Sequence, residues 1–160
     1  MATSFADARE ALAALRAAVR DRPASGPSFA AEAARDSATE ILRRLGGTDD
    51  AFLVACLEEA AAGLQGEACQ DAAVECGAIF DAMEGRACPG VEGVLERIAM
   101  QAPGSWLQKV LVEILRKWDA PRFESILRAA ALRHPTDSVR ASAAEVLVAA
   151  GLAPACGGEC

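Results

Sequence analysis

The chain has 160 residues, 52% of them hydrophobic, and carries a formal net charge of -7. This much apolar surface excludes a chain that stays unfolded, because disordered segments are poor in hydrophobic residues. The negative charge argues against general affinity for nucleic acid or anionic membranes, and no stretch approaches the roughly 20 apolar residues that a membrane-spanning helix needs.

The composition also predicts the class of secondary structure. Alanine, which favours helices more than any other residue, is abundant, and β-branched residues never cluster in alternating runs. We therefore expect an all-α protein. The N-terminus lacks the basic start and apolar block of a secretory signal. We accordingly expect a mature cytoplasmic protein whose six cysteines are reduced.

Apolar residues at helical spacing predict four helices in the first half of the chain. The first covers about residues 4–21 and is followed by a linker, 22–28, with two prolines and a glycine. The second covers about 29–45, the third begins after the acids at 49 and 50, and the fourth covers about 67–84. The inward faces expected for the third and fourth helices are Phe52, Leu53, Cys56, Leu57, Ala60 and Leu64, and Cys69, Ala73, Cys76, Phe80 and Met83.

Four further helices are expected in the second half. The fifth covers about 91–101, and Ser105 with Gln108 forms a capping-box pattern before the sixth. Pro121 is expected in the first turn of the seventh helix, where proline is tolerated. The inward faces expected here are Val91, Val94, Leu95 and Ile98; Leu107, Val110, Leu111, Ile114, Leu115 and Trp118; Phe123, Ile126, Leu127 and Ala130; and Val139, Ala143, Val146, Leu147 and Ala150.

The last helix has clear boundary signals. Pro135 is expected to close the seventh helix, Asp137 to cap the eighth, and Gly151 to end it. Residues 152–160 then form an expected flexible tail rich in cysteine and glycine.

The even-numbered helices end at regular intervals. Their ends fall at Gly46, Gly85, Asp119 and Gly151, which are 39, 34 and 32 residues apart. Each interval holds a pair of amphipathic helices, which is the signature of a helical-repeat array. Because a lone pair cannot cover its own apolar stripe, we predict four stacked pairs in a single domain, residues 1–151. A non-repeating helical bundle is the alternative.

The last pair resembles HEAT-type repeats. These repeats often place a proline after the first helix, an aspartate before the second, and then a Val-Arg pair and small residues. The matching residues over 121–151 are Pro135, Asp137, Val139, Arg140, Ala143, Ala144 and Leu147. The other pairs share only the length and apolar spacing. The resemblance implies a short right-handed α-α superhelix that binds through a curved surface. It also implies a structural Arg140 that donates hydrogen bonds to an aspartate of a neighbouring pair, with a solvated arginine as the alternative.

Charge is distributed unevenly along the chain. Residues 49–100 hold eleven acids against two bases, a net charge of -9, whereas residues 104–140 have a net charge of +3. Glu67, Asp71 and Glu75 are four residues apart and therefore share one face of the fourth helix. We predict that these three bind a protein partner with a basic surface. Ordinary solubilising charge is the alternative explanation.

Catalytic, metal and cofactor sites are not predicted. The single histidine, His134, borders a proline at a helix end, where a capping or surface role is typical. No glycine-rich phosphate loop is present, and no cysteine pair has the two-residue spacing of a zinc motif. We therefore expect a non-catalytic scaffold or adaptor that uses no cofactor and binds protein rather than nucleic acid or membrane.

Two other hypotheses remain. The family resemblance and the basic second half, with Trp106 and Trp118, allow a HEAT-like enzyme such as a DNA-alkylation glycosylase or a chromophore lyase. Cys88 in a loop, with Cys156 and Cys160 in the tail, allows a thiol- or metal-responsive sensor. The remaining cysteines, Cys56, Cys69 and Cys76, are expected to pack in the core as small apolar residues.

Overall fold

The computed structural model describes residues 50–65, 69–101 and 105–152, together with six helical positions between residues 10 and 20. We call these six positions the N-terminal segment: Glu10, Leu12, Ala13, Arg16, Ala17 and Arg20. Every regular element in these ranges is a helix, so the all-α class is confirmed for the described part of the chain. The helix expected over 29–45 and the tail beyond residue 152 lie outside the described residues.

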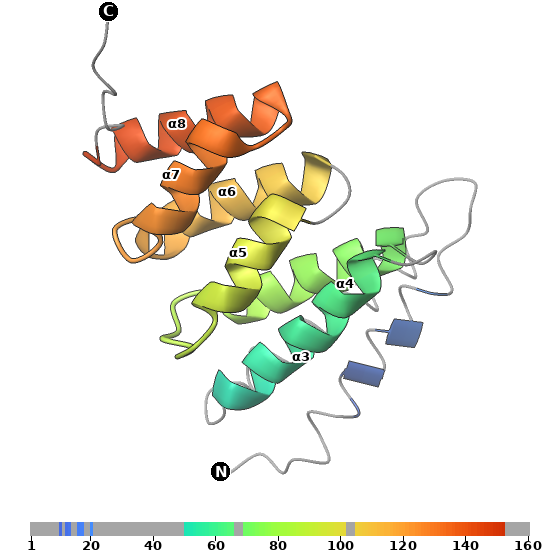
Figure 1. The fold of residues 1–160 in the computed structure, drawn as a ribbon. Coiled ribbons are helices and arrows are strands. Elements are labelled where there is room, and N and C mark those ends of the chain that lie inside the picture. Colours follow the sequence, from blue (N-terminus) through green and yellow to red (C-terminus); the bar gives the residue numbers. More distant parts are fainter. Residues whose placement is uncertain are drawn as a thin grey trace, which may run out of the picture. The chain divides into compact units, whose positions relative to one another are not determined.

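The chain divides into two compact units, residues 1–90 and 91–160, and each is described by itself. The first unit contains α3 (Asp50–Ala62), the 3-10 turn η2 (Gly63–Gln65) and α4 (Cys69–Ala82), which pack against one another (Figure 1). Among the described residues, no helix has the length and apolar character needed to cross a membrane.

The core of the first unit contains most of the apolar faces predicted for α3 and α4. Leu53, Leu57, Cys76 and Phe80 are buried as expected, and Ile79, which the prediction left out, is also fully buried. Phe52 and Ala73, which were also expected to point inward, are only half-buried at the edges of these faces. The backbone at Gly63 lies so close to α4 that an added Cβ would be 3.1 Å from the Cβ of Ala72.

The second unit contains two helix pairs. The first pair is α5 (Glu92–Gln101) and α6 (Ser105–Asp119), and the second is α7 (Glu124–Arg133) and α8 (Asp137–Ala149). Besides the contact within each pair, α5 packs against α7 and α6 packs against α8 (Figure 1). The first helix of one pair therefore contacts the first helix of the other pair, and the two second helices contact each other in the same way.

The apolar face of α6 differs from the predicted stripe. Leu107, Leu111 and Leu115 are buried as expected, but Val110, Ile114 and Trp118 are only half-buried. Val112, which the stripe leaves out, is 1% exposed. The physical reason is that α6 contacts both α5 and α8, so it buries side chains on two sides rather than along one stripe.

The ends of α7 and α8 confirm the predicted stop signals. His134 follows α7 with φ -65° and ψ 136°, the extended conformation that a residue before proline prefers. After α8, Gly151 has φ 71°, and its N–H donates to the Val148 carbonyl at 3.0 Å. The N–H of Leu152 donates to the Leu147 carbonyl at 2.8 Å, which completes a Schellman motif.

The expectations for two helix starts are wrong. Asp137 does not cap α8 but is its first residue; Thr136 occupies the N-cap position, without a side-chain capping hydrogen bond. The carboxylate of Asp137 instead pairs with Arg140 one turn later. Pro121 lies in the turn before α7, because the helix begins only at Glu124.

Candidate functional site

Acidic side chains from two helices converge on one surface hollow in the first unit. Glu59 comes from α3, and Asp71 and Glu75 come from α4, one helical turn apart. Arg16 and Arg20 of the N-terminal segment complete the polar lining. We call this the acidic hollow.

Arg16 connects the two helices across the acidic hollow. Its Nε donates to Glu75 Oε1 at 2.9 Å, and its Nη2 lies 3.2 Å from Glu59 Oε1. The Glu75 side chain is 13% exposed, whereas that of Glu59 is 67% exposed. Burial opposes the positive charge, but the hydrogen bonds to Glu75 and Glu59 outweigh it and raise the pKa of Arg16. The hollow therefore already holds one arginine side chain.

The structure brings together only part of the predicted partner-binding set. Asp71 and Glu75 both line the hollow, and Glu67 lies outside the described residues. Glu75 is engaged by Arg16, whereas no ion pair of the half-buried Asp71 is found among the described residues. Glu59 was not predicted, because its helix is separate in sequence and only the packing of α3 on α4 places it beside Glu75.

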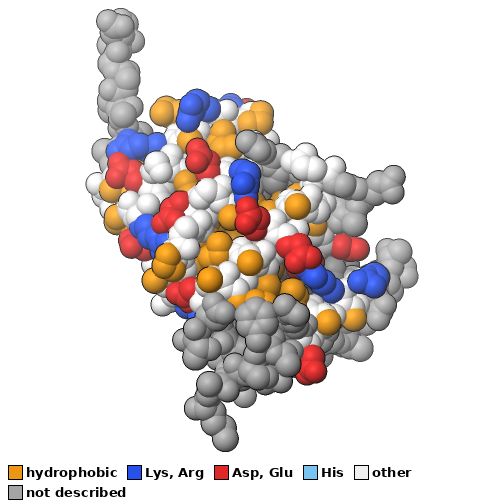
Figure 2. All heavy atoms as spheres, turned by 60° about the horizontal axis from the view of Figure 1, so that its bottom comes forward, with side chains coloured by type: hydrophobic (Ala, Val, Ile, Leu, Met, Phe, Trp, Pro, Cys, Tyr) orange, Lys and Arg blue, Asp and Glu red, His pale blue; other side chains and the backbone are white. Residues whose placement is uncertain are grey.

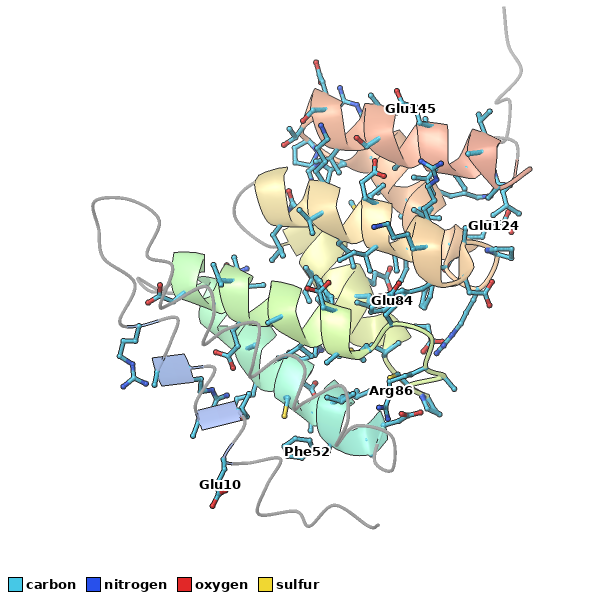
Figure 3. All side chains as sticks on the ribbon, turned by 180° about the vertical axis from the view of Figure 1, so that it is seen from behind. Glu10, Phe52, Glu84, Arg86, Glu124 and Glu145 are labelled. Carbon is cyan, nitrogen blue, oxygen red and sulfur yellow. The ribbon has the colours of Figure 1, made fainter. Side chains whose placement is uncertain are left out.

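A second, mainly apolar hollow lies beside the first along the N-terminal segment. Leu12 of that segment lines it together with Phe52 and Cys56 of α3. Phe52 is labelled in Figure 3. Arg16, Arg20 and Glu59 line both hollows. We call it the apolar hollow; its lining includes Leu12, Phe52 and Cys56, whereas that of the acidic hollow includes Asp71 and Glu75.

The cysteine side chains that the structure describes are buried and reduced. Cys56, Cys76 and Cys88 are 4%, 0% and 2% exposed, and none forms a disulfide. Burial raises the pKa of Cys56 to about 11 and that of Cys76 to about 12, so both thiols are protonated and unreactive at neutral pH. The core positions predicted for Cys56 and Cys76 are confirmed, while Cys69, Cys156 and Cys160 lie outside the described side chains.

Some of the acids in residues 49–100 form ion pairs within their own unit. Asp50 pairs with Arg86, which is labelled in Figure 3, and accepts the Cys88 N–H at 3.1 Å. In the second unit, Arg122 Nε donates to Glu92 Oε1 at 2.8 Å. The face in Figure 2 accordingly shows acidic and basic side chains interspersed. In the acidic hollow, by comparison, three acidic side chains line one surface depression.

Arg140 and His134 have local structural contacts. Arg140 pairs with Asp137 of its own helix and donates to the His134 carbonyl, so the aspartate it contacts is not one of a neighbouring pair. His134 is 1% exposed rather than a surface residue, and its Nδ1 accepts the Thr136 N–H at 3.0 Å. These contacts hold the turn between α7 and α8.

Among the described residues, the side chains that suggested a HEAT-like enzyme or a thiol or metal sensor do not form a site. Trp118 is half-buried, with its ring centre 6.2 Å from that of Phe123, and the Trp106 side chain lies outside the described residues. Within the described ranges, no three histidine, cysteine or acidic side chains lie close enough to hold a metal ion.

Comparison of the chain with protein-family models, with curated proteins and with solved structures finds no match in any of the three. The resemblance of residues 121–151 to HEAT-type repeats therefore depends on the sequence pattern alone.

Proposed function

We propose that this chain is a non-catalytic protein-interaction module that binds a basic partner through the acidic hollow. The observation that carries the proposal is the convergence of Glu59, from α3, and Glu75, from α4, on a single arginine side chain. Carboxylates held by two packed helices form a preorganised acceptor for guanidinium groups, whose fork of donors suits such pairing. Asp71 lines the same hollow and adds a third carboxylate to the surface that faces a partner.

The proposed scaffold is an array of HEAT-like helix pairs. Two features support it: the regular intervals between helix ends in the sequence, and the packing of α5 on α7 and of α6 on α8 in the second unit. In an up-and-down bundle, by contrast, each helix packs chiefly against antiparallel neighbours. A repeat array suits partner binding because stacked helix pairs form an extended surface that a partner can contact.

Affinity capture with a charge-reversed variant tests the proposed function. We expect the wild-type chain to retain a basic protein from an extract of its own cells, and Asp71→Lys to lose it. Asp71 is suited to this test because its replacement leaves the contacts of Arg16 in place. With the purified partner, the variant is expected to bind at least tenfold more weakly, which corresponds to roughly 1.4 kcal/mol.

Glu145→Lys is the matched control. Glu145 is an exposed acid on α8 in the second unit (Figure 3), and its reversal changes the net charge by the same amount. We expect this control to bind like wild type. If both variants lose the partner equally, the recognition is a general charge effect. If neither loses it, the acidic hollow is not the binding surface.

A further inference from the structure

The N-terminal segment contacts the two hollows with two side chains on one face. Leu12 is 7% exposed and lines the apolar hollow with Phe52 and Cys56. Arg16 follows four residues later, so it projects from the same side of the helix and reaches Glu59 and Glu75. The segment thus presents an apolar residue and, one turn on, a cation.

The contacts described for the segment differ in kind from those between α3 and α4. The ion pair with Glu59 is largely exposed, and exposed ion pairs contribute little to stability. The two hollows show that the segment does not fill the space beside it, whereas Leu53, Leu57 and Phe80 in the core are fully buried. Release of the segment alone therefore requires less free energy than unfolding of the unit.

We propose that the N-terminal segment is a releasable internal ligand of the acidic hollow. The partner displaces it with a helix that carries an apolar residue and, four positions later, an arginine or lysine. This inference rests on the proposed function, because it names the partner's chemistry at that same surface. The argument for this occupant is charge complementarity, since Arg16 of the chain itself occupies the position that the partner's cation would take.

The reactivity of Cys56 reports release of the segment without any partner. Cys56 lines the apolar hollow together with Leu12 and Arg16 and is 4% exposed, so we expect it to become accessible when the segment leaves. In the full chain, Arg16→Glu is expected to raise the iodoacetamide labelling rate of Cys56 about tenfold, measured by peptide-resolved mass spectrometry. A purely electrostatic effect has the opposite sign, because the positive charge of Arg16 lowers the pKa of Cys56.

Three comparisons make this measurement specific. Arg20→Glu makes the same charge change one turn away, at a residue that lines both hollows, and is expected to have a much smaller effect. Cys76 of α4 is 0% exposed and is expected to stay protected. The double exchange Arg16→Glu with Glu75→Arg is expected to restore the protection of Cys56.

Several outcomes would overturn the inference. One is an unchanged labelling rate of Cys56 in Arg16→Glu. Another is equal acceleration in Arg20→Glu. A third is joint exposure of Cys56 and Cys76, because the segment would then be inseparable from the core of the unit.

A synthetic peptide of residues 4–22 tests the ligand chemistry. We expect the full-length Arg16→Glu chain to bind this peptide about tenfold more tightly than wild type, whose hollow is occupied, and not to bind a peptide with its own Arg16→Glu change. Equal binding by both chains, or none, contradicts the internal ligand. Loss of the partner-capture result, by contrast, overturns the proposed function and displacement by the partner but leaves the internal ligand standing, because neither labelling nor peptide binding involves the partner.

Discussion

Asp50 holds the loop after α4 against the start of α3. Its carboxylate accepts hydrogen bonds from the Arg86 guanidinium and from the Cys88 N–H. Cys88 is 2% exposed and has φ 37°, a backbone conformation that side chains other than glycine rarely adopt. One carboxylate therefore holds both the cation and the unusual backbone of this loop in place.

We expect Asp50→Asn to lower the free energy of unfolding by about 1–2 kcal/mol at pH 7, because charged hydrogen bonds to a partly exposed group are lost. Hydrogen bonding from Arg86 is the main cause that lowers the pKa of Asp50. Its contribution is therefore complete above the ordinary aspartate pKa of about 4 and is lost as the pH falls through the lower folded value. In urea titrations, the free energy of unfolding should fall less between pH 7 and pH 3 in Asp50→Asn than in wild type. Glu84→Gln, at an exposed acid, serves as control. An identical fall in the free energy of unfolding in wild type and Asp50→Asn would contradict this role of Asp50.

At the scale of elements, the sequence predicts the helices well and their mutual contacts poorly. Helical spacing locates α3 to α8 within a few residues, because each buried stripe repeats along its own chain segment. The burial of Val112 and the pairing of Glu59 with Arg16 depend on which helices become neighbours. No local sequence pattern encodes which helices become neighbours. The contribution of Glu59 and Arg16 to the acidic hollow therefore could not be predicted.

Substitution of three glycines by alanine tests the assigned helix ends and interiors. Gly77 lies within α4 and Gly93 within α5, and a Cβ at either position would meet no atom within 4 Å. We expect Gly77→Ala and Gly93→Ala each to stabilise the protein by about 0.5–1 kcal/mol, because alanine favours the helix. Gly151 has equally open surroundings but φ 71°, so Gly151→Ala should destabilise by about 1 kcal/mol. Thermal unfolding measures all three, and stabilisation by Gly151→Ala would contradict the Schellman motif.

At the scale of the whole molecule, the prediction of a single domain over 1–151 can be tested through cooperativity. Both tryptophans, Trp106 and Trp118, belong to the second unit, so their fluorescence reports on that unit, whereas circular dichroism reports on all helices. Leu57, fully buried in the first unit, offers a remote perturbation. If the chain unfolds as one domain, Leu57→Ala should shift the fluorescence transition in urea by about 2–4 kcal/mol. An unshifted fluorescence transition, with only the circular dichroism affected, would mean that the units unfold independently.

Binding of a basic partner is proposed at the acidic hollow, which Glu59 of α3, Asp71 and Glu75 of α4 and Arg16 of the N-terminal segment line. Hydrogen–deuterium exchange of the full chain, with and without the captured partner, locates the binding surface most directly. We expect slower exchange in peptides that cover Glu59 and Asp71 to Glu75, and unchanged exchange across α7 and α8. Protection confined to α7 and α8, with the acidic hollow unaffected, would contradict binding at this hollow.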